Sequence, residues 1–202
     1  AKQVRGRVDL NLPVCSCPGG EMECVMSGEF VCKLFNTAWK LFGGPAYAAG
    51  VSALAGRKGE KLFSEKLSIT DSCESMAKGY WFPFDCEGTG GKEQRIVEEG
   101  VFTGLLHNLE SAAALCGEPC GNAGRKPTIS GTVQTDITAV PKNFTILAGE
   151  KSEQELLSDL DGIYLIECFD EFHCVDTSSG DFVIPAEGIM VEKGRMKGRV
   201  VN

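Results

Sequence analysis

Glycine interrupts this sequence so often that only short helices and strands fit between its positions. The chain has 25 Gly among 202 residues, roughly twice the usual share. Many apolar runs end at turn-forming groups, such as residues 178–180 and 193–194. Tight turns of this kind join neighbouring antiparallel strands, and no alternating strand–helix pattern is present. We therefore predict an α+β fold, a mostly antiparallel sheet (meander-like or barrel-like) with about three short helices.

Helical periodicity is clear in three segments. Apolar residues recur at three- and four-residue spacing over residues 29–42, and Ser27 can cap the start of that helix. A shorter helix is predicted over residues 109–115. A third helix is predicted to start at Ser152, which has Glu155 three positions later, the spacing of a capping box. We expect its buried stripe to consist of Leu156, Leu157 and Leu160.

Strand signals occupy most of the remainder. Residues 94–107 predict a hairpin that turns at Gly100, because glycine adopts positive φ without steric cost. Short strands are predicted at residues 4–10 and 67–70, and residues 121–140 have the composition of an exposed loop. Residues 162–202 predict an antiparallel meander. We expect its breaks at residues 170–171, 178–180, 185–188 and 193–194.

Charge and hydropathy exclude two classes of protein. Lys and Arg number 20 against 28 Asp and Glu, which gives a net charge of −8. Nucleic-acid binding relies on clustered cations, so we expect no nucleic-acid partner. The longest apolar stretch without a charge is residues 41–56, and it contains several Gly and a Pro. It is too short and too polar to cross a membrane, so we expect no membrane association.

The ten cysteines show no spacing typical of a disulfide framework or a zinc site. The only two histidines, His107 and His173, are far apart in sequence. The N-terminal cations Lys2, Arg5 and Arg7 are not followed by the apolar segment of a secretory signal. We therefore expect reduced thiols, a cytoplasmic location and no metal held by this chain.

Two groups could support acid–base or nucleophilic chemistry. His107 would need a nearby thiol such as Cys116 or Cys120, or it is an ordinary residue with its ring at the surface. Asp85 and Glu87 could act as an acid–base pair if buried together, or they belong to a solvated turn.

A third candidate is the basic segment at residues 122–126. Its cations could hold a peptide carboxylate through charge-assisted hydrogen bonds. They could equally be ordinary solvated charges of a loop.

An ordered set of motifs resembles the TldD/PmbA family, also called modulators of DNA gyrase. The first resembles the family's Pro-Phe-Asp-x-Glu-Gly segment, and the last resembles its Gly-Phe-Trp-Ile-Glu-Asn-Gly segment. The similar segments are Pro83-Phe84-Asp85-Cys86-Glu87-Gly88, Glu99-Gly100-Val101, Gly121-Asn122-Ala123-Gly124-Arg125, Pro141-Lys142-Asn143-Phe144, Thr177-Ser178-Ser179-Gly180-Asp181-Phe182 and Gly188-Ile189-Met190-Val191-Glu192-Lys193-Gly194. The resemblance is good over residues 51–201 and loose over the first 50. It implies that residues 1–202 form a single C-terminal-type domain of a longer prokaryotic protein, whose N-terminal domain lies outside this sequence.

The resemblance also implies a division of roles. TldD-type subunits resemble zinc metallopeptidases with a His-Glu-x-x-x-His motif, which this sequence lacks. The segment from Ser52 to Phe63 resembles the PmbA type, also called TldE, a companion without zinc. The resemblance therefore implies peptide processing beside a TldD-type subunit or a second copy as a dimer, with zinc only in the TldD-type partner. The alternative is a non-enzymatic protein-binding or scaffold domain linked to DNA gyrase modulation.

The resemblance indicates three residues that could contact a peptide substrate. These are Asn122, Arg125 and Asp181, and no residue of this chain is assigned a catalytic role. The sequence departs from the family pattern at Cys86, and at residues 117–120 just before the loop that contains Asn122.

Overall fold

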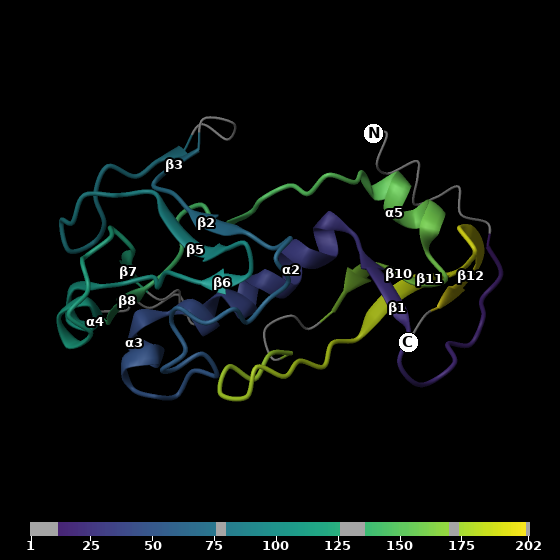
Figure 1. The fold of residues 1–202 in the computed structure, drawn as a ribbon, viewed down its shortest axis with the longest axis horizontal. Coiled ribbons are helices and arrows are strands. Elements are labelled where there is room, and N and C mark those ends of the chain that lie inside the picture. Colours follow the sequence, from purple (N-terminus) through teal and green to yellow (C-terminus); the bar gives the residue numbers. More distant parts are fainter. Residues whose placement is uncertain (1–11, 76–79, 126–135, 170–173, 201–202) are drawn as a thin grey trace. The chain divides into compact units, whose positions relative to one another are not determined.

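The computed structural model describes residues 12–75, 80–125, 136–169 and 174–200. The strand predicted at residues 4–10 lies outside this part, as does the predicted break at 170–171. The chain divides into two compact units (Figure 1). The first comprises residues 1–37, 150–175 and 182–202, and the second comprises residues 38–149 and 176–181. Within each unit, short helices accompany mainly antiparallel strands, so the predicted α+β class is confirmed.

The first unit is built on a four-stranded sheet. Strand β10 pairs antiparallel with β11, and β11 pairs antiparallel with β12, which confirms the predicted meander. The predicted break at 185–188 is wrong, because β11 already starts at Ala186. Strand β1 adds at the other edge, parallel to β10. The sheet order is β1-β10-β11-β12, with bounds Glu23–Met26, Gly162–Cys168, Ala186–Glu192 and Arg195–Val200.

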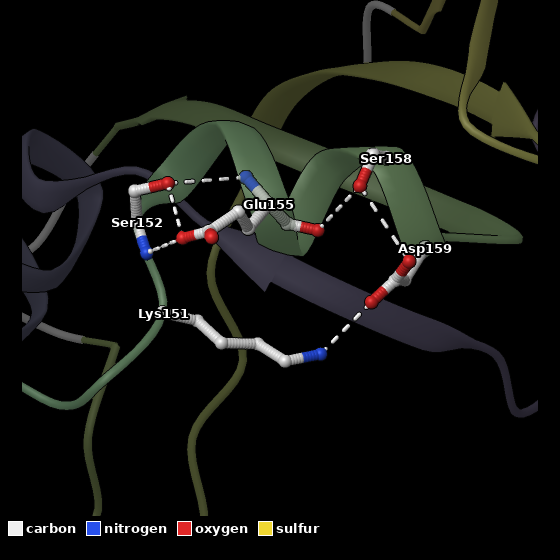
Figure 2. Close-up of polar contacts among 5 residues, drawn as sticks. All are labelled: Lys151, Ser152, Glu155, Ser158 and Asp159. Atoms are coloured by element: carbon white, nitrogen blue, oxygen red, sulfur yellow. Dashed lines mark hydrogen bonds and ion pairs between the residues drawn. The ribbon is translucent and has the colours of Figure 1, made fainter.

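Two helices with side-chain caps belong to or begin in this unit. Helix α2 (Gly28–Ala38) begins where predicted, and the Ser27 hydroxyl accepts the Phe30 N–H at 3.1 Å. It continues into the 3₁₀ helix η1 (Trp39–Phe42). Helix α5 (Glu153–Asp159) has the predicted capping box. The Ser152 hydroxyl accepts the Glu155 N–H, and the Glu155 carboxylate accepts the Ser152 N–H (Figure 2).

The buried stripe predicted for α5 is only partly correct. Leu160 is buried with Ile189 and Val191 in the core of this unit, and Leu157 packs against them partly buried. Leu156 is 41% exposed. No residue of the seven-residue helix itself is buried, because Leu160 is its C-cap, and of the two leucines within the helix only Leu157 packs against this core.

The second unit contains the predicted hairpin. Strands β5 (Gln94–Glu98) and β6 (Val101–Phe102) are joined by Glu99 and Gly100, with φ of 47° and 81°. Two positive φ values are typical of the type I′ turn, whose twist matches that of the strands. The strand predicted at 67–70 is shifted to Ile69–Asp71 (β2). The four-stranded sheet has the order β6-β5-β2-β9, with β9 at Thr145–Ile146.

Short elements complete this unit. Helix α4 (Leu109–Ala114) matches the predicted helix, and its N-cap is Asn108, whose side chain accepts the Ser111 N–H. A further helix was not predicted: α3 (Gly44–Ala48). Two small hairpins pair β3 (Glu74–Ser75) with β4 (Tyr80–Trp81), and β7 (Ala123–Arg125) with β8 (Ile137–Ala139). The prediction of an exposed loop over 121–140 is therefore wrong at its two ends, because Gly121 to Gly124 are buried and β7 pairs with β8. Its middle, residues 126–135, lies outside the described part of the chain.

The turn between β11 and β12 offers a test of this packing. Gly194 has φ 73°, and a Cβ there would lie 2.3 Å from the Ser158 carbonyl oxygen. We expect Gly194→Ala to lower the free energy of unfolding by more than the roughly 1 kcal/mol cost of positive φ alone. Gly50→Ala is the matched control, because Gly50 has nearly the same φ, 70°, and open space around it. Urea denaturation that gave the two variants equal stability would contradict this contact.

Candidate functional site

A buried polar network surrounds Asn122, just before β7. The Asn122 side chain is 1% exposed. Its amide nitrogen donates to the Asp71 carboxylate at 2.7 Å and to the Val140 carbonyl at 3.0 Å. Its amide oxygen accepts a hydrogen bond from Gln94. Asn122 thus connects the end of β2, the start of β5 and the chain leaving β8.

Asp71 is the charged centre of this network. Besides Asn122, its carboxylate accepts the backbone N–H groups of Lys142 at 2.9 Å and Asn143 at 2.9 Å. Burial raises the pKa of Asp71, and the hydrogen bonds from Asn122, Lys142 and Asn143 oppose that rise. The three donors satisfy a carboxylate that would otherwise be costly to bury. Asp71 therefore holds both ends of the β7–β8 hairpin at the end of β2.

Asp85 plays a similar part on the other side of β7. Its carboxylate accepts the N–H groups of Glu87, Thr89 and Ala123, each at 2.9 Å. The Glu87 carboxylate instead accepts the Leu109 N–H at 2.8 Å. Because the two carboxylates bind different backbone groups, the geometry does not favour an acid–base pair. Asp85 therefore connects the loop that follows it, residues 86–89, with the start of β7.

His107 and Cys120 lie together in the interior, so the interpretation of His107 as a surface residue is wrong. His107 Nδ1 lies 3.2 Å from the Ser111 hydroxyl, and Cys120 Sγ accepts the His107 N–H at 3.2 Å. Burial lowers the pKa of His107 and raises the pKa of Cys120. A neutral thiol is a poor nucleophile, and its contact is with the His107 backbone rather than the ring. This cluster is therefore suited to packing rather than to nucleophilic catalysis.

The donor set does not fit a hydrolytic zinc ion. Within residues 12–75, 80–125, 136–169 and 174–200, no three His, Cys, Asp or Glu side chains form a group that could hold a metal. The His107 ring faces the Ser111 hydroxyl, and the buried carboxylates of Asp71 and Asp85 are occupied by backbone N–H groups. A catalytic zinc needs three protein ligands that converge on one point.

The three predicted substrate-contacting residues occupy different environments. Asn122 is buried in the network, whereas Arg125 at the end of β7 and Asp181 in the segment 176–181 are exposed. Sequence reasoning missed Asp71 and Lys142. Asp71 follows a short apolar strand and could have been noticed as its last residue, but its partners lie 51 to 72 positions away in sequence.

Comparison with known proteins identifies the family. The sequence profile of the PmbA/TldA metallopeptidase C-terminal domain matches residues 19–202. The chain belongs to this family. The PmbA/TldD resemblance found in the motifs is thereby confirmed.

Two curated relatives of this PmbA/TldD-family chain are archaeal. A protein named metalloprotease from Archaeoglobus fulgidus is 34% identical over 154 residues, which are 74% of this chain and 34% of that protein. Another protein named metalloprotease, from Methanothermobacter thermautotrophicus, is 33% identical over 153 residues, which are 73% of this chain and 31% of that protein. The chain thus spans about a third of the length of these relatives.

Solved structures share the fold. A protein described as a modulator of a DNA gyrase from Thermotoga maritima matches with a TM-score of 0.78 and 28% identity, covering 93% of this chain and 41% of that one. TldE from Thermococcus kodakarensis matches with a TM-score of 0.80 and 20% identity, covering 98% of this chain and 44% of that one. At that identity the second match shows a shared fold only.

No helix in the described part of the chain is both long and apolar enough to cross a membrane.

Removal of the Asp71 carboxylate tests the network. We expect Asp71→Ala to lower the free energy of unfolding by about 3 kcal/mol, because it removes an acceptor from the buried Asn122 amide and leaves the partly buried N–H groups of Lys142 and Asn143 without one. The exposed Asp136, in the same unit, provides the control. Asp136→Ala should change stability by less than about 0.5 kcal/mol in the same urea titration. Equal effects of the two substitutions would show that the network contributes no stability.

Burial of His107 predicts a pH dependence. Because its pKa in the folded state is lower than its ordinary value of 6.5, the unfolded chain takes up the proton first as the pH falls. Stability should therefore be complete well above 6.5 and decline as the pH falls through 6.5 toward the lowered value. The urea midpoint of unfolding is measured at each pH for the wild-type chain and for a His107→Gln variant. The difference between the two midpoints isolates the contribution of His107. A difference that does not change with pH would contradict a buried neutral ring.

Proposed function

We propose that this chain is the C-terminal domain of a PmbA-type companion, which has no zinc of its own and acts beside a zinc-bearing TldD-type subunit in peptide or protein processing. The cytoplasm is the expected location, and a dimer with the TldD-type subunit or with a second copy is the expected assembly. Family membership and relatives named metalloprotease support a role in this class of peptidase.

The arrangement of the side chains that could bind zinc is the observation that carries the proposal. Within the described residues no group of His, Cys, Asp and Glu side chains could hold a metal ion. The buried polar groups described above have structural partners: Asp71 and Asp85 bind backbone N–H groups, and His107 faces Ser111. A chain arranged in this way can bind and position a peptide, but hydrolysis needs an activated water or nucleophile from elsewhere.

The second candidate function is a protein-binding or scaffold domain without a part in catalysis. Its support is the 28% identical structure from Thermotoga maritima, which is described as a modulator of a DNA gyrase. The two functions differ in one requirement, because only the companion needs a partner with a His-Glu-x-x-x-His motif.

Reconstitution distinguishes them. We expect the chain alone to show no peptidase activity when zinc is added, and to form an active zinc-containing complex when co-expressed with a TldD-type subunit. Zinc is measured by elemental analysis after size-exclusion chromatography, and cleavage is measured with unfolded casein.

Two variants sharpen this experiment. Replacing the histidines of the partner's motif should abolish both zinc and cleavage. His107→Gln in this chain, checked for folding by circular dichroism, should preserve both. Zinc bound by this chain alone together with cleavage, or loss of zinc from the complex on His107→Gln, would overturn the proposal. Absence of any complex would favour the scaffold function.

A further inference from the structure

Three aromatic side chains that lie within four residues of sequence are exposed in the second unit. Trp81 is 69% exposed, Phe84 is 66% exposed, and Phe82 between them is 39% exposed. We call Trp81, Phe82 and Phe84 the aromatic loop. Exposed aromatic groups that occur together mark interaction surfaces more often than single exposed apolar residues do, and Trp is enriched among the residues that dominate binding energy.

The backbone of the aromatic loop is fixed. The Phe82 N–H donates to the Cys73 carbonyl at 2.8 Å, and Phe84 forms an antiparallel bridge with Gly90. The next residue, Asp85, is buried and accepts three backbone N–H groups. A ligand that binds here does not have to order the loop, so less of its binding energy is lost to conformational entropy.

A cation lies beside one of these aromatics, Phe82. The Lys142 ammonium is 5.6 Å from the centroid of the Phe82 ring, and it donates to the Ala123 carbonyl at 3.2 Å. Among the residues that the structure describes, Lys142 forms no salt bridge, although its charge also acts on the buried Asp71 carboxylate and opposes the rise in the pKa of Asp71. A half-buried ammonium next to exposed rings attracts a ligand that combines a negative charge with an apolar group.

The surrounding backbone indicates which kind of carboxylate fits. Capture of a chain terminus typically uses several free backbone N–H groups. Here the N–H groups of Lys142 and Asn143 are already bound to Asp71. Because the two N–H groups next to the ammonium already have an acceptor, the ammonium favours the side-chain carboxylate of an internal Asp or Glu over a C-terminal carboxylate.

We propose that the aromatic loop and Lys142 form a docking site for an unfolded peptide segment in which an aromatic or large apolar residue lies close to an Asp or Glu. The peptide's apolar side chain packs on Trp81 and Phe84, and its carboxylate pairs with Lys142. This inference rests on the proposed function in peptide processing and names the class of peptide that the chain holds.

Binding of short synthetic peptides to the 202-residue chain tests the site. The probe is blocked at both ends and has one Phe and one Glu in a Gly-Ser background; sister peptides have Ser for Phe or Gln for Glu. Titration calorimetry at low salt should show binding of the Phe-Glu probe, weaker by about tenfold for the Ser peptide and by about fivefold for the Gln peptide. A C-terminal carboxylate added to the Gln peptide should not restore affinity.

Variants of the protein should mirror these losses. Phe84→Ser and Trp81→Ser should each weaken the Phe-Glu probe by about tenfold, whereas Val183→Ser should not, although Val183 is 84% exposed. Lys142→Met should weaken it by about fivefold. The Lys142→Glu variant should bind a probe that has Lys in place of Glu more tightly than it binds the Phe-Glu probe. A damaged fold would not produce this reversal of preference.

The outcomes separate the two proposals. If the probe binds but is insensitive to Phe84→Ser, Trp81→Ser and Lys142→Met, this site is wrong and the proposed peptide-processing function stands. If neither the probe nor unfolded casein binds the chain or its complex with the TldD-type subunit, both proposals fail. If Phe84→Ser changes the oligomeric state measured by sedimentation but not the affinity for the probe, the surface around Phe84 joins two copies of the chain. That result would overturn the docking site.

Discussion

The buried carboxylate of Asp71 is the constraint from which the geometry of the second unit follows. Removing a carboxylate from water costs several kcal/mol unless its oxygens are satisfied by donors. Here the donors come from Asn122, Lys142 and Asn143, which stand at the two ends of the β7–β8 hairpin. The interior position of one charge at the end of β2 therefore determines where that hairpin begins and ends.

Ala123 connects this network with the residues at the surface through three hydrogen bonds of its backbone. Its N–H donates to Asp85, and its carbonyl accepts both the Cys86 N–H and the Lys142 ammonium, each at 3.2 Å. The first two contacts fix the segment that follows the exposed aromatic residues, and the third places the Lys142 cation near Phe82. A side chain larger than methyl at position 123, which is fully buried, would disturb both. The exposed aromatics and the cation are thus positioned by one small strand residue.

Local signals in the sequence were sufficient for part of this structure. Ser27 and the Ser152–Glu155 pair act as caps because capping depends on residues only a few positions apart. The turn at Gly100 was predictable for the same reason. The segment 121–140 was not, because its glycines and polar residues are typical of a loop, and the strands it contains depend on a carboxylate 51 positions earlier. Leu156 shows the related limit for burial: periodicity indicates an apolar face but not how much of that face a neighbour covers.

The same reasoning explains why residue chemistry alone could not locate the candidate site. Asp85, Glu87, His107 and Cys120 are residue types found in catalytic centres, yet each directs its polar atoms at backbone groups or at a neighbouring hydroxyl. Only the partners distinguish a structural carboxylate from a catalytic one, and those partners come from other elements of the fold. What these residues provide is a rigid support. The groups left for a ligand are at the surface: the exposed aromatic rings and the Lys142 ammonium, which forms no ion pair within the described residues. These groups supply apolar area and charge, but they are not activated nucleophiles. The proposed division of labour, in which this chain holds a peptide and a partner cleaves it, rests on a surface of this kind.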